Sequence, residues 1–92
     1  MPIRNAIIAL DDLHEDPRNP RVHSAVNVRR LADRIAAVGF TSPVLVVEET
    51  GKLAAGHRRV LALRYLRDEL HQAPPDGLEA DWGVPARVGS WD

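Results

Sequence analysis

The stretch Lys52-Leu53-Ala54-Ala55-Gly56-His57-Arg58-Arg59-Val60-Leu61-Ala62-Leu63 decides the expected fold, because it passes from a short apolar strand through one glycine into a helix. The first backbone N–H groups of a helix have no partner within it, and the helix dipole is positive at that end. Arg58 and Arg59 fall in this first turn, where cations are disfavoured unless a negative ligand compensates them. The segment therefore predicts a phosphate-sized anion site at Gly56, His57, Arg58 and Arg59.

The flanking segments predict a small α+β fold with helices packed against a short mixed sheet. Residues 43–48 are typical of a β-branched strand, and residues 49–51 predict a turn that joins it to the strand at 52–55 as a hairpin. Ser24 or Asn27 can cap a helix that runs to about Val38 and stops at Gly39. The other expected elements are a buried strand at 6–10, a proline loop at 13–23, a helix at 56–71 with Leu63, Leu66 and Leu70 inward, and an edge strand at 84–88, where Pro85 cannot donate to a ladder.

Length and composition limit the classes of function. The 92 residues suffice for one domain, expected over 1–92, so that function must come from one site. Twelve basic residues against thirteen acidic ones exclude a polycationic tail, and the lack of cysteine excludes a disulfide framework, a thiolate nucleophile and a Cys-based zinc site. No apolar run approaches the ~20 residues of a membrane span, and the start is not typical of a signal peptide. We expect a cytoplasmic protein that does not contact a membrane.

Three blocks of sequence, in this order, resemble the ParB N-terminal domain, also called the ParB/sulfiredoxin-like domain. They are residues 16–24, residues 31–46, and residues 55–59 together with 84–88. The resemblance covers about residues 6 to 90, and the first block is most similar to ParB-like domains of phage and plasmid proteins. Full partition proteins continue into a helix-turn-helix domain, so the chain is expected to be either a stand-alone relative or a fragment of a longer protein.

The resemblance implies a ligand for the predicted anion site. In ParB proteins the matching Gly-Glu-Arg-Arg block holds the triphosphate of a cytidine nucleotide with magnesium, which makes CTP or ATP and Mg²⁺ the expected cofactors. Gly56, Arg58 and Arg59 match this block, whereas His57 replaces the glutamate, and nucleotide hydrolysis is therefore not implied. Arg18 and Arg21 of the proline loop either converge on the same anion or face water. Sulfiredoxins carry a reactive cysteine in this block, so sulfinic-acid reductase activity is excluded.

The leading hypothesis is a ParB-like module that binds nucleotide or DNA phosphate, has no catalytic residue and no metal ligand, and serves a bacterial or phage DNA transaction. Such transactions include chromosome or plasmid partition, transcriptional regulation and DNA modification. The alternatives are a metal-dependent nuclease or small phosphotransferase, with Glu15 or Asp16 as base and His57 as acid or ligand, and a protein-interaction domain. A three-His metal site formed by His57 with His14 and His23 is a further option. The expected partners are a nucleotide or the DNA backbone and an additional domain or protein, and a homodimer stays open.

Overall fold

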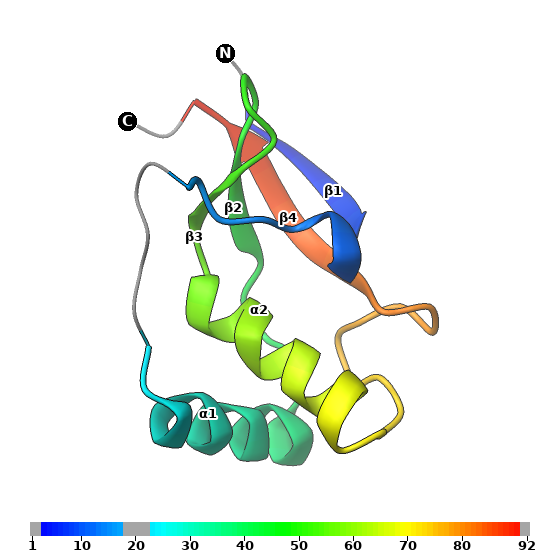
Figure 1. Ribbon diagram of the computed structural model, residues 1–92. Helices are drawn as coiled ribbons and strands as arrows, with labels where there is room; N and C mark the ends of the chain where they lie inside the picture. Colours follow the sequence, from blue (N-terminus) through cyan, green and yellow to red (C-terminus); the bar gives the residue numbers. More distant parts are fainter. Residues whose placement is uncertain (1–2, 18–22, 91–92) are drawn as a thin grey trace.

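The computed structural model describes residues 3–17 and 23–90, and within them four strands form one mixed sheet (Figure 1). The strand order is β1-β4-β2-β3. β4 pairs antiparallel with β1 and parallel with β2, and β2 pairs antiparallel with β3. The elements run in the order β1 (Arg4–Ala9), η1 (Leu10–Asp12), α1 (Ala25–Val38), β2 (Val44–Val47), β3 (Leu53–Ala55), α2 (His57–Arg64), η2 (Tyr65–Glu69) and β4 (Gly83–Gly89). The α+β class with a short mixed sheet is confirmed.

The first helix and the hairpin lie where local signals predict them. Ser24 caps α1, since its Oγ accepts a hydrogen bond of 3.1 Å from the backbone N–H of Asn27. Gly39 ends the helix with a φ of 93°, a conformation that glycine adopts without a side-chain penalty. β2 and β3 form the expected hairpin, with a register shift between Leu45 and Val46.

Two predictions for the sheet are wrong: the edge strand at 84–88 and the buried strand at 6–10. β4 is a central strand, and the parallel ladder with β2 begins at Ala86, so that Pro85 lies one residue before it, where only β1 pairs with β4. A proline is tolerated there because the strand has one neighbour at that register. β1 is one of the two edge strands and is largely exposed rather than buried, with Ile7 at its centre 55% exposed.

The core lies between the sheet and α2, and α1 packs along α2 on the side away from the sheet (Figure 1). Its largest fully buried side chains come from both layers and from the segment after β1: Leu10, Leu13, Leu63, Leu66, Val44, Val60 and Val84. In the described residues no helix is long and apolar enough to cross a membrane.

The second helix ends differently from the expectation. A regular helix to about His71 would turn Leu70 inward, yet after Arg64 the chain widens into the π-helical turn η2, closed by a 3.1 Å hydrogen bond from the Leu70 N–H to the Tyr65 carbonyl. A π turn adds one residue to the helical repeat and so rotates the side chains that follow it. Leu63 and Leu66 are buried as predicted, whereas Leu70 is exposed.

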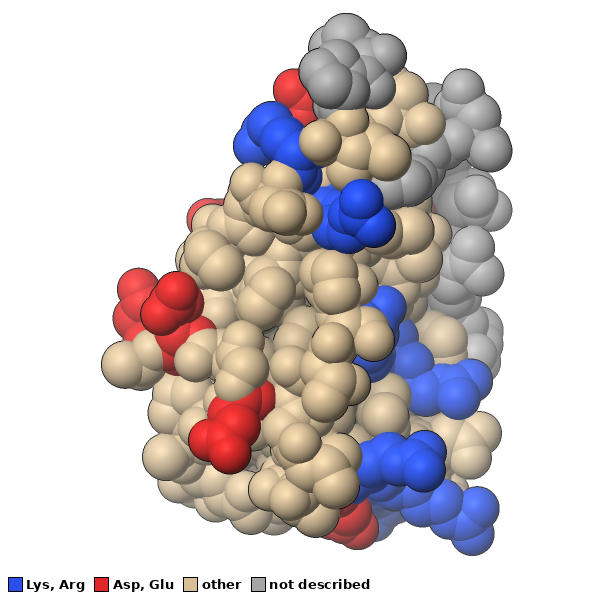
Figure 2. Space-filling model, turned by 180° about the vertical axis from the view of Figure 1, so that it is seen from behind, with Lys and Arg blue, Asp and Glu red and all other residues tan. Residues whose placement is uncertain are grey.

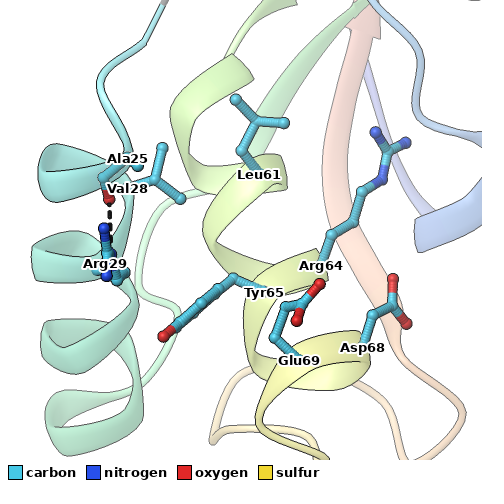
Figure 3. A pocket seen from close by; sticks show the side chains of 8 residues that line it. All are labelled: Ala25, Val28, Arg29, Leu61, Arg64, Tyr65, Asp68 and Glu69. Carbon is cyan, nitrogen blue, oxygen red and sulfur yellow. Dashed lines mark hydrogen bonds between the residues drawn. The ribbon is translucent and has the colours of Figure 1, made fainter.

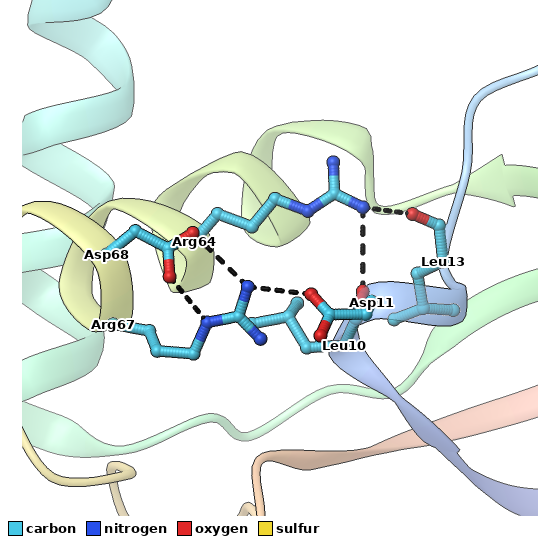
Figure 4. A network of polar contacts seen from close by, with 6 residues as sticks. All are labelled: Leu10, Asp11, Leu13, Arg64, Arg67 and Asp68. Carbon is cyan, nitrogen blue, oxygen red and sulfur yellow. Dashed lines mark hydrogen bonds and ion pairs between the residues drawn. The ribbon is translucent and has the colours of Figure 1, made fainter.

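Two arginines near the end of α2 tie η1 to this helix (Figure 4). The Arg64 guanidinium donates to the backbone carbonyls of Leu10 and Leu13. Arg67 pairs with the Asp11 carboxylate at 2.7 Å and with the Asp68 carboxylate, also at 2.7 Å. These contacts fix the segment that leaves β1 against the helix that begins at the predicted site.

Candidate functional site: the junction of β3 and α2

Gly56 is the hinge between β3 and α2. Its φ of 98° is left-handed, and a Cβ added there would lie 2.6 Å from Cγ1 of Val44 in the neighbouring strand. Only glycine meets both conditions without strain. The Gly56 carbonyl accepts the first helical hydrogen bond, from Val60 N–H at 3.0 Å, and no side chain caps the helix start. The backbone therefore turns the positive end of α2 toward this junction.

A hollow of about 410 Å³ opens at this junction. It collects all four residues of the predicted anion motif from the β3–α2 connection. It is lined by His23, Leu31, Ala54, Ala55, Gly56, His57, Arg58 and Arg59. Arg58 is the exposed cation of this group. The space and charge suit a phosphate group.

Arg59 lines the same hollow, and its guanidinium is turned toward the loop between α1 and β2. It donates to the carbonyls of Ser42 and Pro43, the latter at 3.2 Å, and lies 5.7 Å from the centroid of the Phe40 ring. Burial lowers the pKa of Arg59 below its ordinary value. The two adjacent arginines therefore differ: Arg58 is exposed at the hollow, and Arg59 holds the loop behind it.

We expect Arg59→Ala to lower the free energy of unfolding by about 1–3 kcal/mol, because it removes charge-assisted hydrogen bonds to two carbonyls and a cation–π contact. Arg58→Ala, the matched control in the same helical turn, should change stability by less than about 0.5 kcal/mol. Urea unfolding followed by circular dichroism measures both values. Equal losses in the two variants would contradict the division of roles.

The three histidines are not gathered into a metal site. His57 is buried, 8% exposed, in the first turn of α2, whereas His14 is exposed and bridges to Lys52 beside β3. Over residues 3–17 and 23–90 no group of three His, Cys, Asp or Glu side chains is placed to hold a metal ion. The three-His option of the sequence analysis is therefore not supported.

Two polar side chains of the proline loop, which the sequence analysis named for other roles, each have a buried atom. His23 Nε2 and Glu15 Oε1 are buried without a hydrogen-bond partner, and His23 lines the hollow. Unpaired buried polar atoms are costly, which makes His23 a candidate ligand-facing residue that the sequence suggested only as a metal ligand. Its position two residues after Arg21 was the available signal. Arg18 and Arg21 themselves lie outside the described residues.

A second hollow, of about 440 Å³, lies between α1 and α2 and contains none of the predicted site residues (Figure 3). Val28, Leu61 and Tyr65 form its apolar part, while Arg29 is drawn back by a 3.3 Å hydrogen bond to its own helix at the Ala25 carbonyl. Asp68 and Glu69 line the same hollow. With acidic side chains in its wall, this hollow suits a phosphate less well than the junction at Gly56.

Charge is unevenly spread over the surface even though the net charge is close to zero. Figure 2 shows Lys and Arg side chains in a band that runs from the upper left to the lower right of the visible face, with most Asp and Glu side chains to the left of this band. A band of basic side chains provides local attraction for polyanions although the chain overall is not basic.

Comparison with known proteins supports the resemblance, although no protein-family model matches the chain. Over 58 residues, 63% of this chain, it is 40% identical to the ParB-like nuclease domain-containing protein YnaK of Escherichia coli (strain K12). The chain also matches, with a TM-score of 0.67, the crystal structure of the C-terminally truncated chromosome-partitioning protein ParB from Caulobacter crescentus complexed with CTP-gamma-S. The chain is therefore similar to a ParB-like domain in sequence and to ParB in fold.

The two matches cover only part of the proteins compared. The match covers 66% of YnaK, just under two thirds, and 46% of the partitioning protein, although it takes in 97% of this chain. Sequence identity to the partitioning protein is 22%, so this second likeness concerns the ParB-like fold alone.

Proposed function

We propose that this ParB-like domain binds the phosphate groups of a nucleotide in the hollow where β3 meets α2. The observation that carries the proposal is the exposed Arg58 beside an uncapped helix start, at a glycine whose missing side chain leaves the backbone open. Phosphate oxygens are the ligand that a helix N-terminus with an adjacent arginine suits best. The fold neighbour complexed with CTP-gamma-S makes CTP the first candidate, with ATP as the second and Mg²⁺ as an accompanying ion.

The expected binding free energy shows whether Arg58 and the helix start suffice for tight nucleotide binding. A charge-assisted contact from Arg58 contributes about 1.5–3 kcal/mol, and the helix start adds about 0.5–1 kcal/mol, before ordering costs. A sum of about 2–4 kcal/mol corresponds to binding at or weaker than about 1 mM. Tighter binding would require donors beyond these two, for which we propose His23, Arg18 and Arg21, or contacts to the base and ribose.

Isothermal titration with CTP, ATP and GTP, each with and without magnesium, tests the proposal. We expect heat with at least one nucleotide and a Kd raised about tenfold or more in Arg58→Ala, which loses a charge-assisted contact. Arg30→Ala is the matched control, since Arg30 is an exposed arginine on α1 that does not line the hollow. No heat with any of the three nucleotides, or an unchanged Kd in Arg58→Ala, contradicts the proposal.

Within a cell we propose that this phosphate binding serves a bacterial or phage DNA transaction such as partition, transcriptional regulation or DNA modification. The ParB-like relatives, one from a chromosome-partitioning protein, support this class of role. DNA phosphate is the second candidate ligand for the same hollow, and it would bind with a salt dependence set by few contacts.

A hydrolytic role is the second candidate function, because the relative YnaK is described as containing a ParB-like nuclease domain. The candidate residues are Glu15 or Asp16 as base and His57 as acid. The described residues hold no cluster of three metal ligands, so this role has less support than binding. Metal-dependent DNA nicking that disappears in His57→Ala is the result that would favour it.

A further inference from the structure

Exposed arginines without a carboxylate partner lie on three elements of the described chain. They are Arg34 on α1, Arg58 in the first turn of α2 and Arg87 in β4. In the part of the chain that the structure describes, the arginine–carboxylate pairs belong to Arg4 and Arg67. The first three guanidinium groups therefore keep a positive charge that is open to an external anion.

Arg34 lines a hollow that adjoins the candidate phosphate site. This hollow, of about 420 Å³, lies beside α1 and shares Leu31 and Arg59 with the hollow at the β3–α2 junction. Among the described residues, no Asp or Glu side chain lines either hollow. A negatively charged ligand that extends from Arg58 to Arg34 therefore meets no like charge in these walls.

Arg87 lies on the other side of the candidate phosphate site, across the sheet. Its register partner in β2 is Leu45, which in turn pairs with Ala55 of β3, a residue that lines the phosphate hollow. Arg87 faces away from the core, because Val88, the next residue of the strand, is buried in the core. Two strand spacings, about 10 Å, separate Arg87 from Ala55, which corresponds to about three nucleotide steps along the axis of a DNA duplex.

We propose that Arg34, Arg58 and Arg87 form a track for the phosphate backbone of double-stranded DNA, with the hollow at Gly56 at its centre. This track rests on the proposed phosphate site at Arg58 and extends it to a ligand longer than one nucleotide. Figure 2 shows a band of Lys and Arg side chains, as a polyanion requires. Single strands are usually held by bases stacked on exposed aromatic rings. The Phe40 ring beside α1 is buried, and no Tyr or Trp of the described residues lines either hollow. Phosphate contacts to a duplex, which carry no sequence information, fit this surface better.

Fluorescence anisotropy with a labelled duplex of about 20 base pairs, at salt concentrations from about 50 to about 200 mM, measures DNA binding. We expect a Kd that rises with salt, with a slope of log Kd against log salt concentration of about 3, because each arginine contacts one phosphate. Arg34→Ala and Arg87→Ala should each raise the Kd about fivefold or more and lower the slope by about 1. Arg29→Ala is the matched control, because it removes the same charge from a different hollow, between α1 and α2, and it should change neither value. Circular dichroism establishes that each variant is folded.

Titration with CTP, ATP and GTP separates failure of the track from failure of the nucleotide site. Arg87→Ala should leave the Kd for a nucleotide unchanged, because Arg87 does not line the phosphate hollow. A folded domain that binds a nucleotide but no duplex at the lowest salt overturns the track and leaves the nucleotide site standing. Duplex binding that depends on Arg34 and Arg87, without heat from any of the three nucleotides, supports the track and contradicts nucleotide binding. A duplex Kd that is unchanged in Arg34→Ala and Arg87→Ala, or tighter binding to the single strand, overturns the track as well.

Discussion

Replacing Gly77 by alanine is expected to lower the free energy of unfolding by about 3 kcal/mol or more. Gly77 has a φ of +96°, and a Cβ added there would lie 2.1 Å from the backbone oxygen of Phe40. The left-handed conformation alone costs a residue with a side chain about 1–2 kcal/mol, and overpacking commonly adds about 1–3 kcal/mol. The loss is a large part of the roughly 5–14 kcal/mol that holds a domain of this size folded.

The clash at Gly77 has no easy relief, because the neighbouring atoms are backbone. The Phe40 N–H donates to the Asp76 carbonyl at 2.7 Å, which ties the loop before β4 to the end of α1. A Cβ on Gly39 would itself lie 3.0 Å from that carbonyl oxygen. Phe40 is buried, so its peptide cannot shift without disturbing the core.

Urea unfolding of both Gly77→Ala and Gly51→Ala separates the cost of the left-handed backbone from the cost of the Cβ clash. Gly51 has a φ of +70°, but a Cβ there would meet no atom within 4 Å. Gly51→Ala should therefore show the conformational cost alone, about 1–2 kcal/mol. If the two variants lose the same stability, the close approach of Gly77 to Phe40 is not what demands the glycine.

Local signals in the sequence predicted those parts of the fold that local chemistry determines. A capping serine, a terminating glycine and a turn glycine each act within four residues, and α1 and the β2–β3 hairpin lie where these residues indicate. Gly77, by contrast, could be recognised only as part of a helix-breaking loop. Its contact with Phe40 joins positions 37 residues apart, and no local pattern contains it.

The order of strands is a long-range property and was predicted less well. Pro85 indicated an edge strand, because proline lacks an N–H, yet the staggered pairing of β1 and β2 leaves it one neighbour inside a central strand. The apolar run of β1 indicated burial on both faces. In the structure only one face meets the core, since no helix or strand of residues 3–17 and 23–90 covers the other side.

In the candidate site, too, the features set by local sequence were predicted and those set by long-range contacts were not. The hollow at Gly56 and the exposed Arg58 follow from a strand–glycine–helix pattern and were predicted. Arg59 was also predicted as a ligand residue. The sequence does not show that its guanidinium donates to the carbonyls of Ser42 and Pro43, because these residues lie 17 and 16 positions before it. His23 was named in the sequence only as a metal ligand, and its place in the hollow became visible only in the fold, which brings the residues before α1 beside the start of α2.

Gly56→Ala is expected to combine a loss of stability of about 2–4 kcal/mol with a damaged phosphate site. The left-handed φ is lost or strained, and the new Cβ meets Cγ1 of Val44, which is fully buried in β2. Relief requires the start of α2 to move away from the sheet, and Arg58 moves with it. Urea unfolding gives the stability, and titration with CTP under conditions where the variant is folded gives the binding.

A double-mutant cycle with Val44→Ala identifies the contact responsible. Val44→Ala alone loses stability by leaving a cavity, but in the double variant the alanine at 56 gains the space that Cγ1 vacated. The double variant should therefore be more stable than the sum of the single losses implies, by about 1 kcal/mol or more. Simple additivity would mean that the left-handed backbone alone, and not the packing of β2 against the helix start, demands glycine at this junction.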